Sequence, residues 1–321
     1  MWTTERRARA RRGSALLAVL WLSAALAAIA FALSTTVRGE TERTATALDG
    51  LRAYYLASGA VERATAELLW SITSPDGRKI PVGARVVSYA FPSGSADVEI
   101  IPEAAKLDVN RASPEQLYRL MVALGIDEER SRNLAAEIAQ ARIPSLAGLS
   151  GPDNLSPGSS FSRPGASFQE IEELLLLKGI TPDIFYGTYT PAAEREGGPR
   201  LVRSGGLADC LTVFDSGTAV DANMAAPAVL AAVGLSPLAV TALVEQRRQA
   251  PLTQAQLGEF GGNLRVGGNS IVTLRATARL RLPNGQYSDL RRTVAAQVKF
   301  MPDGFDAPIH VLRWYDAAWS E

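Results

Sequence analysis

Residues 14–33, SALLAVLWLSAALAAIAFAL, are twenty consecutive positions without a charge, a proline or a glycine. An α-helix rises about 1.5 Å per residue, so a helix of this length matches the roughly 30 Å hydrocarbon core of a bilayer. Residues 1–13 hold five arginines against one glutamate, and the next charges after the run are Arg38 and Glu40. Under the positive-inside rule, residues 1–13 lie in the cytoplasm and everything after the run lies outside it. The N-terminus therefore predicts a single-pass membrane protein.

Two other interpretations of the apolar run stay open at this point. One is a secretory signal cleaved after the A-x-A sequence of residues 30–32, and the other is a plain signal anchor that tethers an unrelated domain. The residues that follow favour an uncleaved helix, because no proline occurs before Pro75. Spacings of three and four, typical of a helix docked on a folded body, are found at Leu51, Tyr55, Ser58, Val61, Thr65, Leu68 and Ile72. We therefore expect one helix over 14–73, with its first half in lipid and its second half packed on a soluble head.

The composition narrows the possible chemistry. The chain has 321 residues, of which 47% are hydrophobic, and a single cysteine, Cys210, which excludes an intrachain disulfide framework and a cysteine-based zinc site. Its single histidine, His310, argues against a His-dependent catalytic triad and a multi-histidine metal site. The 33 basic side chains balance the 33 acidic ones, and since residues 1–13 carry +4, the remainder carries −4. That remainder lacks the broad positive field of a nucleic-acid-binding protein.

Strand patterns lie on both sides of a helical block. Residues 80–91 and 96–101 alternate around the turn-forming cluster at 92–95, and residues 270–281 and 287–300 flank Pro283-Asn284-Gly285, a strong hairpin signal. Residues 309–315 suit a last strand at the sheet edge. This order predicts one β head that is interrupted by a helical insertion.

An internal duplication lies within the insertion. Asp108, Asn110, Ala112, Pro114 and Leu117 are matched in order, 113 residues later, by Asp221, Asn223, Ala225, Pro227 and Leu230. Each copy then reaches an apolar-Gly-apolar turn, at 124–126 and 233–235, followed by a helix over 128–142 and 237–249. Five matched positions with shared turns predict two helix-hairpin-helix units.

Local signals refine the first of these units. Ser113 is the predicted N-cap of a helix, Pro114 suits its first position, and Gln116 completes a capping box. Pro144 to Ala166 is rich in glycine, serine and proline and predicts a long loop. A third helix is expected over 168–178, ending at Gly179.

An arginine-rich leader that ends in Gly13 and runs into an apolar and then amphipathic helix resembles the class III leader of type IV pilins and type II secretion pseudopilins. The resemblance implies that a prepilin peptidase cuts between Gly13 and Ser14 on the cytoplasmic side, that Ser14 becomes N-methylated, and that the anchor stays in the mature protein. Most pilins carry Glu at the fifth mature position, where this chain has Ala18. A charge in hydrocarbon costs several kcal/mol unless it is paired, so such a Glu is useful only below another subunit. Its absence is similar to the K-type minor pseudopilins (general secretion pathway protein K), which sit at a filament tip.

Three segments lie where the landmarks of that family lie: residues 108–114, 175–180 and 211–214. The implied fold is α+β, a pilin-like long N-terminal helix packed on an antiparallel β-sheet with a large inserted helical domain containing two helix-hairpin-helix (SAM-like) units. The expected divisions are a leader (1–13), a long helix (14–73, transmembrane 14–33), a β head (74–105 and 265–321) and an insertion (106–264, with a first unit 106–187 and a second unit 207–264).

The resemblance implies a non-enzymatic subunit at the tip of the type II secretion pseudopilus. Its head would be periplasmic and its anchor would lie in the bacterial inner membrane. Its implied partners are the I- and J-type minor pseudopilins, met through the N-terminal helix, and the prepilin peptidase, with no nucleic acid and no cofactor. A structural calcium ion is a further hypothesis for Asp303, Asp306 and the acids at 170–173, although EF-hand spacing is absent.

Several individual residues can be explained by structural or surface roles. His310 alternates with apolar neighbours and is expected to be a structural or surface residue, and Cys210, in a strand-like segment, is expected to be a buried free thiol. Trp314, Tyr315 and Trp319 suit either an exposed interaction strip or core packing.

Alternative functions remain open from the sequence. A membrane-anchored helix-hairpin-helix DNA receptor of the competence type would need free hairpin amides and nearby cations. Here the first hairpin is followed by acids at 127–129, Pro237 in the second has no N–H, and the basic pair Arg247-Arg248 suits a solvated helix end. A minor pilin of a type IV pilus is a close variant, and an anchored periplasmic hydrolase lacks a recognisable nucleophile–base pair.

The mature N-terminus tests the leader. Intact-mass measurement or N-terminal sequencing of the chain expressed with a prepilin peptidase should find Ser14, N-methylated. A new terminus near Leu33 would instead mean an ordinary exported protein, because the helix would then have been cut at the outer face of the membrane.

Overall fold

The computed structural model describes residues 4–74, 79–142, 167–191, 201–214, 218–260, 263–268, 270–301 and 304–318. The part that we call the head consists of α1 (Thr4–Thr73), β1 (Val86–Phe91), β2 (Gly94–Pro102), β9 (Ile271–Arg281), β10 (Tyr287–Phe300) and β11 (Ile309–Tyr315). The part that we call the insertion runs from β2 to β9 and contains η2 (Glu103–Ala105), β3 (Leu107–Asp108), α2 (Pro114–Ala123), α3 (Glu128–Ala141), η5 (Ile171–Leu176), α4 (Pro182–Tyr186), β4 (Thr188–Pro191), β5 (Leu201–Ser204), α5 (Leu207–Cys210), β6 (Leu211–Thr212), β7 (Val220–Asp221), α6 (Pro227–Ala232), α7 (Pro237–Gln249), η6 (Gln254–Glu259) and β8 (Leu264–Arg265).

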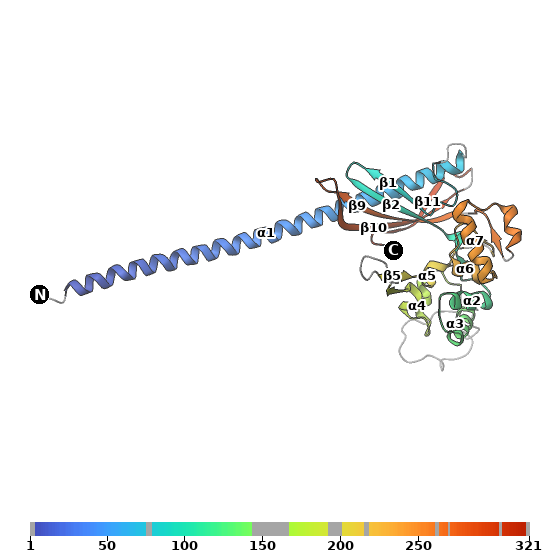
Figure 1. The fold of residues 1–321 in the computed structure, drawn as a ribbon, viewed down its shortest axis with the longest axis horizontal. Helices are drawn as coiled ribbons and strands as arrows, with labels where there is room; N and C mark the ends of the chain where they lie inside the picture. Colours follow the sequence, from blue (N-terminus) through green and yellow to red (C-terminus); the bar gives the residue numbers. More distant parts are fainter. Residues whose placement is uncertain are drawn as a thin grey trace.

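The helix α1 is continuous from Thr4 to Thr73, so the predicted uninterrupted rod is confirmed, and it also includes most of the leader. At about 1.5 Å per residue, its 70 residues span about 105 Å. Figure 1 shows its first part projecting alone, far from the rest of the protein, and its last part lying along the sheet. The chain therefore consists of a bare rod and a folded body.

The head sheet is antiparallel, with the strand order β1-β2-β9-β10-β11. The predicted Asn-Gly hairpin joins β9 to β10: Leu282 N–H donates to the carbonyl of Gln286, and Gly285 takes a left-handed φ of 82°. The strand β11 lies at the sheet edge, as predicted. Because β2 and β9 are neighbours that flank the insertion in sequence, the insertion leaves the sheet and returns to it at adjacent strands.

The first predicted strand and turn need correction. The strand begins at Val86 instead of residue 80, because Pro81 has no N–H to donate and Gly83 turns the chain with a left-handed φ of 77°. The predicted turn at 92–95 contains only Pro92 and Ser93, since Gly94 already pairs with Phe91. A Cβ at position 94 would collide with the carbonyl oxygen of Arg279, which explains why a glycine begins β2.

The face of α1 that docks on the sheet also differs from the prediction. Leu51, Tyr55 and Ile72 are exposed, and only Val61 of the predicted stripe is fully buried. The buried face is built instead from small residues, namely Ala53, Ala57, Ala60 and Ala64, with Leu56 and Val61. The opposing strands likewise present the buried alanines Ala276, Ala278 and Ala296. Small side chains on both surfaces let the helix backbone approach the sheet closely, and larger ones are left outside.

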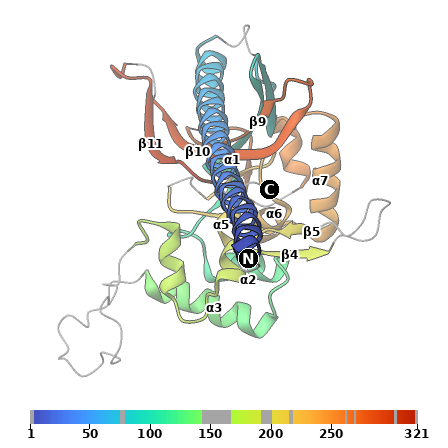
Figure 2. The ribbon, with the colours of Figure 1, turned by 90° about the vertical axis from the view of Figure 1, so that its left-hand side faces the viewer.

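The insertion has its own hydrophobic core. Its buried residues form a cluster that extends from Ala105 to Leu257, separate from the cluster between α1 and the sheet. The helices α2 and α6 of the two repeats pack together, and each repeat has a short parallel bridge, β3 with β6 and β7 with β8. Figures 1 and 2 show these helices on the side of the sheet away from α1. The sheet therefore separates two bodies.

Other predicted elements of the insertion are largely confirmed. Ser113 and Gln116 form the predicted capping box, α7 has the predicted bounds, and α3 ends one residue early. The helix predicted over 168–178 is instead the short 3₁₀ helix η5, because Ile171, Leu174 and Leu177 face the core at every third position. Of the landmark segment 211–214, the first two residues form the strand β6.

The close approach of α1 predicts sensitivity to volume. Ala60 has no exposed surface. The substitution Ala60→Leu should lower the free energy of unfolding of the head by about 1–3 kcal/mol, because added methyl groups force the helix off the sheet. The control Ala45→Leu lies on the bare part of the same helix and should change it by less than about 0.5 kcal/mol. Thermal unfolding followed by circular dichroism measures both, and equal effects would contradict close packing.

Candidate functional site

The first candidate site is the anchor half of α1. Among the described residues, one helix is long and apolar enough to cross a membrane; its best window, with a mean hydropathy of 2.5, has none of its residues buried. Ala18 is exposed on it, and Gly13 and Ser14 lie in the same continuous helix. A helix that exposes large apolar side chains around its whole circumference is stable in an apolar medium such as a bilayer and not in water. This half therefore has the properties of a single-pass anchor.

A second feature, which we call the bare stripe, lies between the anchor and the head. It consists of Val37, Thr41, Thr44, Leu48, Leu51 and Tyr55, at alternating spacings of four and three. Its four large members are between 45% and 66% exposed. Alternation of four and three averages 3.5 residues, the repeat by which two helices pack along a shared seam.

The two threonines do not interrupt this stripe. Thr41 Oγ1 donates to the carbonyl of Val37 at 2.8 Å, and Thr44 Oγ1 donates to the carbonyl of Glu40 at 2.8 Å. Each hydroxyl is thus satisfied by its own helix, which leaves the methyl group to present outward. The bare stripe is therefore an apolar face none of whose residues belongs to either hydrophobic cluster of the described chain.

Beside α1, the head carries an apolar groove of about 400 Å³ between the helix and β11. Val311 and Trp314 of β11 form one wall, and Leu69 and Trp70 of α1 form the other. Of the aromatic strip considered from sequence, Trp314 therefore faces the groove and Tyr315 faces the opposite side of the sheet, both partly exposed. Trp319 lies outside the described residues.

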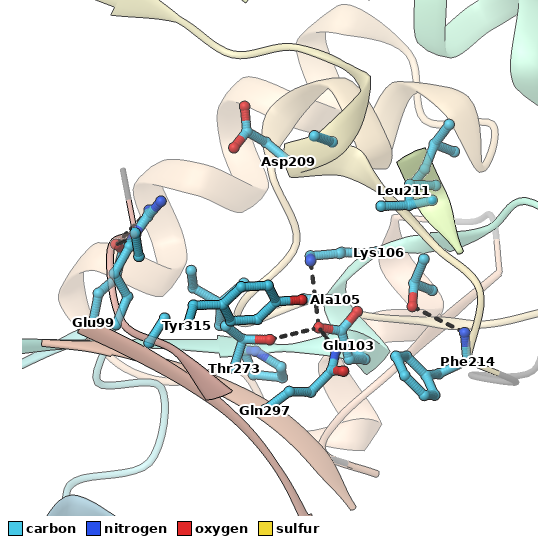
Figure 3. A pocket seen from close by; sticks show the side chains of 18 of the residues that line it. Glu99, Glu103, Ala105, Lys106, Asp209, Leu211, Phe214, Thr273, Gln297 and Tyr315 are labelled. Atoms are coloured by element: carbon cyan, nitrogen blue, oxygen red, sulfur yellow. Dashed lines mark hydrogen bonds and ion pairs between the residues drawn. The ribbon is translucent and has the colours of Figure 1, made fainter. Parts of the chain in front are cut away.

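A polar cleft of about 410 Å³ lies between the sheet and the insertion. Figure 3 shows Glu103 at its centre. Glu103 Oε1 accepts hydrogen bonds from Thr273 Oγ1 at 2.9 Å and from Gln297 Nε2 at 3.1 Å, and Lys106 Nζ lies 3.4 Å away. Because Glu103 begins the insertion and its two donors, Thr273 and Gln297, belong to β9 and β10, this carboxylate ties the insertion to the sheet.

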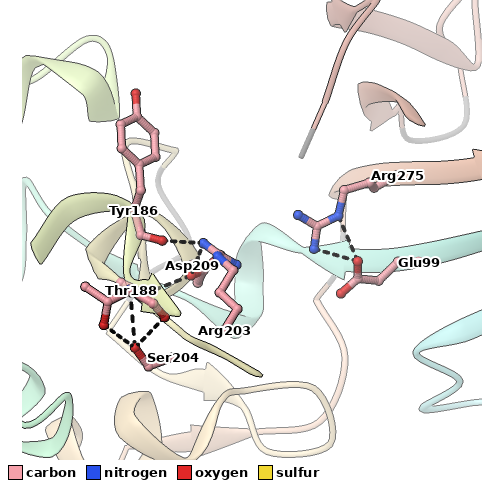
Figure 4. A network of polar contacts seen from close by, with 8 residues as sticks. Glu99, Tyr186, Thr188, Arg203, Ser204, Asp209 and Arg275 are labelled. Atoms are coloured by element: carbon pink, nitrogen blue, oxygen red, sulfur yellow. Dashed lines mark hydrogen bonds and ion pairs between the residues drawn. The ribbon is translucent and has the colours of Figure 1, made fainter. Parts of the chain in front are cut away.

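Ion pairs line the rest of the cleft, as Figure 4 shows. Arg275 Nη2 lies 2.6 Å from Glu99 Oε2, and Arg203 Nη2 lies 2.8 Å from Asp209 Oδ2. Arg203 Nη2 also donates to the carbonyl of Tyr186. The described residues that line the cleft include no serine, cysteine or histidine. The charged side chains of Glu99, Arg275, Arg203 and Asp209 are thus held in two ion pairs.

The acids considered for calcium have other contacts. Glu170 pairs with Arg313 of β11, and the Glu173 carboxylate accepts hydrogen bonds from the N–H groups of Gln169 and Glu170. Asp306 is exposed, and Asp303 lies outside the described residues. Within the described ranges, no group of three acids, histidines or cysteines comes together.

The repeats share a polar network that the sequence did not reveal. Asp108 accepts from the N–H of Asn110, and Asp221 accepts from the N–H of Asn223. Both asparagines then bond a distant backbone twice, at Phe168 for Asn110 and at Leu252 for Asn223. The duplicated Asp-x-Asn pattern is therefore a structural clamp that closes each repeat.

Two arginines complete these clamps. Arg142 Nη1 donates to the carbonyls of Val109 and Ala112, and Arg247 Nη1 donates to those of Ala222 and Ala225. Burial lowers the pKa of both guanidinium groups, that of Arg247 to about 10. The prediction of a solvated helix end is thus wrong for Arg247, although Arg248 is exposed. The sequence did contain a signal for this role, since each repeat has an arginine near the end of its second helix.

The hairpins between the paired helices also have internal partners. Gly125 N–H donates to Val122 and Ile126 N–H to Met121, and Gly234 and Leu235 donate in the same way within the second repeat. The Asp127 carboxylate caps the N-terminus of α3 by accepting from Glu129 and Arg130 N–H groups. A carboxylate in this position opposes a phosphate.

The single histidine and the single cysteine have the structural settings that we expected from the sequence. His310 is exposed on β11, and Cys210 is a buried free thiol whose pKa burial raises to about 12. Cys210 ends the short helix α5 instead of lying in a strand.

Neither a protein-family model nor a curated protein sequence matches this chain. The fold, a long N-terminal helix on an antiparallel sheet with further helices, is an α+β pilin-like fold. Among solved structures it is similar to GspK in the crystal structure of the GspK-GspI-GspJ complex from the enterotoxigenic Escherichia coli type 2 secretion system. The TM-score is 0.53 at 13% sequence identity, and the match covers 87% of this chain and 100% of that chain. This chain therefore has a GspK-like pseudopilin fold.

The clamp arginines give a matched pair of neighbours. Arg247→Met should lower the free energy of unfolding by about 2–4 kcal/mol, because two carbonyls lose a charged donor. Arg248→Met removes only the exposed ion pair with Glu245 and should cost less than about 0.5 kcal/mol. Denaturant unfolding of the two variants distinguishes the roles, and an equal small loss would show that Arg247 is solvated after all.

Proposed function

We propose that this chain is a non-enzymatic minor pseudopilin that acts at the tip of a type II secretion pseudopilus in protein export across the outer membrane. The observation that carries the proposal is the bare stripe. It continues the membrane anchor into water as an apolar helical face with a 3.5-residue repeat. Such a face is stabilised by packing against a second helix. The protein is thus built to assemble through α1.

The partners follow from the fold and from that face. The solved relative is a complex of GspK with GspI and GspJ, which supports I- and J-type minor pseudopilins as the partners here. The anchor would lie in the bacterial inner membrane, with the leader in the cytoplasm and the head in the periplasm. The prepilin peptidase would cut between Gly13 and Ser14 and leave Ser14 N-methylated.

The tip position draws on two features. Ala18 replaces the Glu whose carboxylate would meet a subunit above it. The insertion, within which we propose two helix-hairpin-helix units over residues 106–264, lies on the side of the sheet away from α1 (Figure 2) and widens the head beyond the pilin core. A head of this width would clash in a regularly stacked filament, whereas a terminal subunit meets no such limit.

The competence-type DNA receptor has less support. The guanidinium groups of Arg142 and Arg247 donate hydrogen bonds to buried carbonyls, and the hairpin N–H groups donate to carbonyls within their own turns. Nucleic-acid binding needs cations that can reach phosphates. A type IV pilus minor pilin differs from our proposal only in the system that it serves.

The bare stripe provides the test. The full chain, co-expressed with the I- and J-type minor pseudopilins of its own system, is solubilised in detergent and the copurified partners are quantified. Leu48→Glu should weaken association about tenfold or more, because a carboxylate would be buried in the helix seam. Thr46→Glu places the same charge on the opposite side of α1 and should bind like the unaltered chain.

A secretion assay in cells that lack the chain links assembly to export. Leu48→Glu should fail to restore export and Thr46→Glu should restore it. Unchanged association of Leu48→Glu would contradict assembly through the stripe. Salt-sensitive binding of duplex DNA by the full chain in detergent would favour the receptor instead.

A further inference from the structure

The helix α1 covers only part of the sheet face on which it lies. It packs against β2, β9 and β10. The edge strand β11 therefore keeps its own apolar side chains on that face, and Val311 is 58% exposed. The groove between them has Ala296 and Val298 of β10 as its floor. It is a mainly apolar site, with the exposed Glu62 as the one charged residue among its described lining residues, and it has a helix on one side and a strand on the other.

The spacing of elements defines what fits there. Neighbouring strands lie about 4.8 Å apart, so β11 is about 10 Å from the strand two positions away. Packed helices also lie about 8–10 Å apart. A second helix laid alongside α1 on the same face would consequently rest over β11 and cover Val311 and Trp314. Helix-on-helix and helix-on-strand distances are thus satisfied together.

The groove is continuous with the bare stripe. Beyond Tyr55 the same three-and-four spacing continues through Ser58, Glu62, Thr65 and Leu69, and the last three line the groove. Thr65 Oγ1 donates to the carbonyl of Val61 at 2.8 Å, so this threonine too is satisfied internally. One partner helix can therefore follow α1 from Val37 to Leu69, about 48 Å.

An extended strand fits the site less well. The pairing of β10 with β11 shifts register between Gln297 and Val298, whose partners are Arg313 and Val311, so Leu312 forms a bulge. A bulge bends an edge strand and disrupts the ladder that an added strand would continue.

We propose that the groove between α1 and β11 is the docking seat, at the level of the head, for the N-terminal helix of a second pilin-like chain that runs parallel to α1. The inference rests on the proposed function for the identity of the partner, and it adds the head surface that the partner meets. The partner helix would present apolar side chains at spacings of three and four to Val311, Trp314 and Leu69.

Site-specific photo-crosslinking tests this seat. The full chain carries p-benzoyl-phenylalanine at position 311, 310 or 48 in membranes that contain the I- and J-type minor pseudopilins of its own system. Position 311 faces the groove, whereas His310 is the exposed neighbour that does not line it. The probe at 311 should capture a partner, with mass spectrometry placing the adduct in the partner's N-terminal helix. The probe at 310 should give at most one tenth of that yield.

The probe at Leu48 keeps the two proposals distinguishable. Capture at 48 without capture at 311 would overturn the seat and leave the proposed function standing. Adducts at 310 and 311 that both map to a partner strand would mean strand addition at β11 and would also overturn it. Capture at neither 48 nor 311 would overturn both.

A pair of substitutions gives an independent measurement. Val311→Asp should weaken copurification of the partner about tenfold, while His310→Asp should leave it unchanged. Both positions are exposed, so the melting temperature of each variant alone should match that of the unaltered chain. Equal binding by the two variants would overturn the seat.

Discussion

The constraint on which the structure depends is the close contact between the alanine face of α1 and the alanines of β9 and β10. Ala57, Ala60 and Ala64 are fully buried against the sheet. Small side chains on both surfaces remove the usual spacer between a helix and a sheet, so the helix lies low and in one orientation. That orientation directs the larger side chains of α1 away from the body. The same contact that builds the head therefore leaves the molecule with an apolar face that it does not cover itself.

The insertion, in contrast, is stabilised by hydrogen bonds from polar side chains to its backbone. The insertion is a duplicated unit in which Asp, Asn and Arg side chains bond backbone groups at equivalent places. Buried backbone carbonyls need donors, and a guanidinium satisfies two at once. The guanidinium groups of Arg142 and Arg247 are thus part of the internal hydrogen bonding of the insertion. Glu103 joins this body to the sheet through Thr273 and Gln297, so the insertion is held by polar contacts as well as by its two chain connections.

Taken together, these features separate three tasks along the chain. The anchor half of α1 suits lipid, the middle offers a helix seam, and the head combines the docked helix with an open groove at β11. The insertion lies on the far side of the sheet, where it does not obstruct either apolar surface (Figure 1). The proposed assembly role would use this separation, because partners would approach along the helix while the insertion stays clear of them.

Four features could be predicted from local periodicity or local turn chemistry: the continuous helix, the hairpin at Asn284-Gly285, the capping box at Ser113 and the duplication. The face of α1 that docks on the sheet could not be predicted in this way. Periodicity ranks the faces of a helix by hydrophobicity and therefore favoured the face with Leu51 and Tyr55. Packing against the sheet instead favours the face with small side chains. The partners of Arg247 could not be predicted either, since a basic residue at a helix end looks solvated until the carbonyls of Ala222 and Ala225 come near it in space. Local order follows from neighbours in the chain, but the choice of a buried face and of an arginine's partner depends on surfaces that only the folded chain brings together.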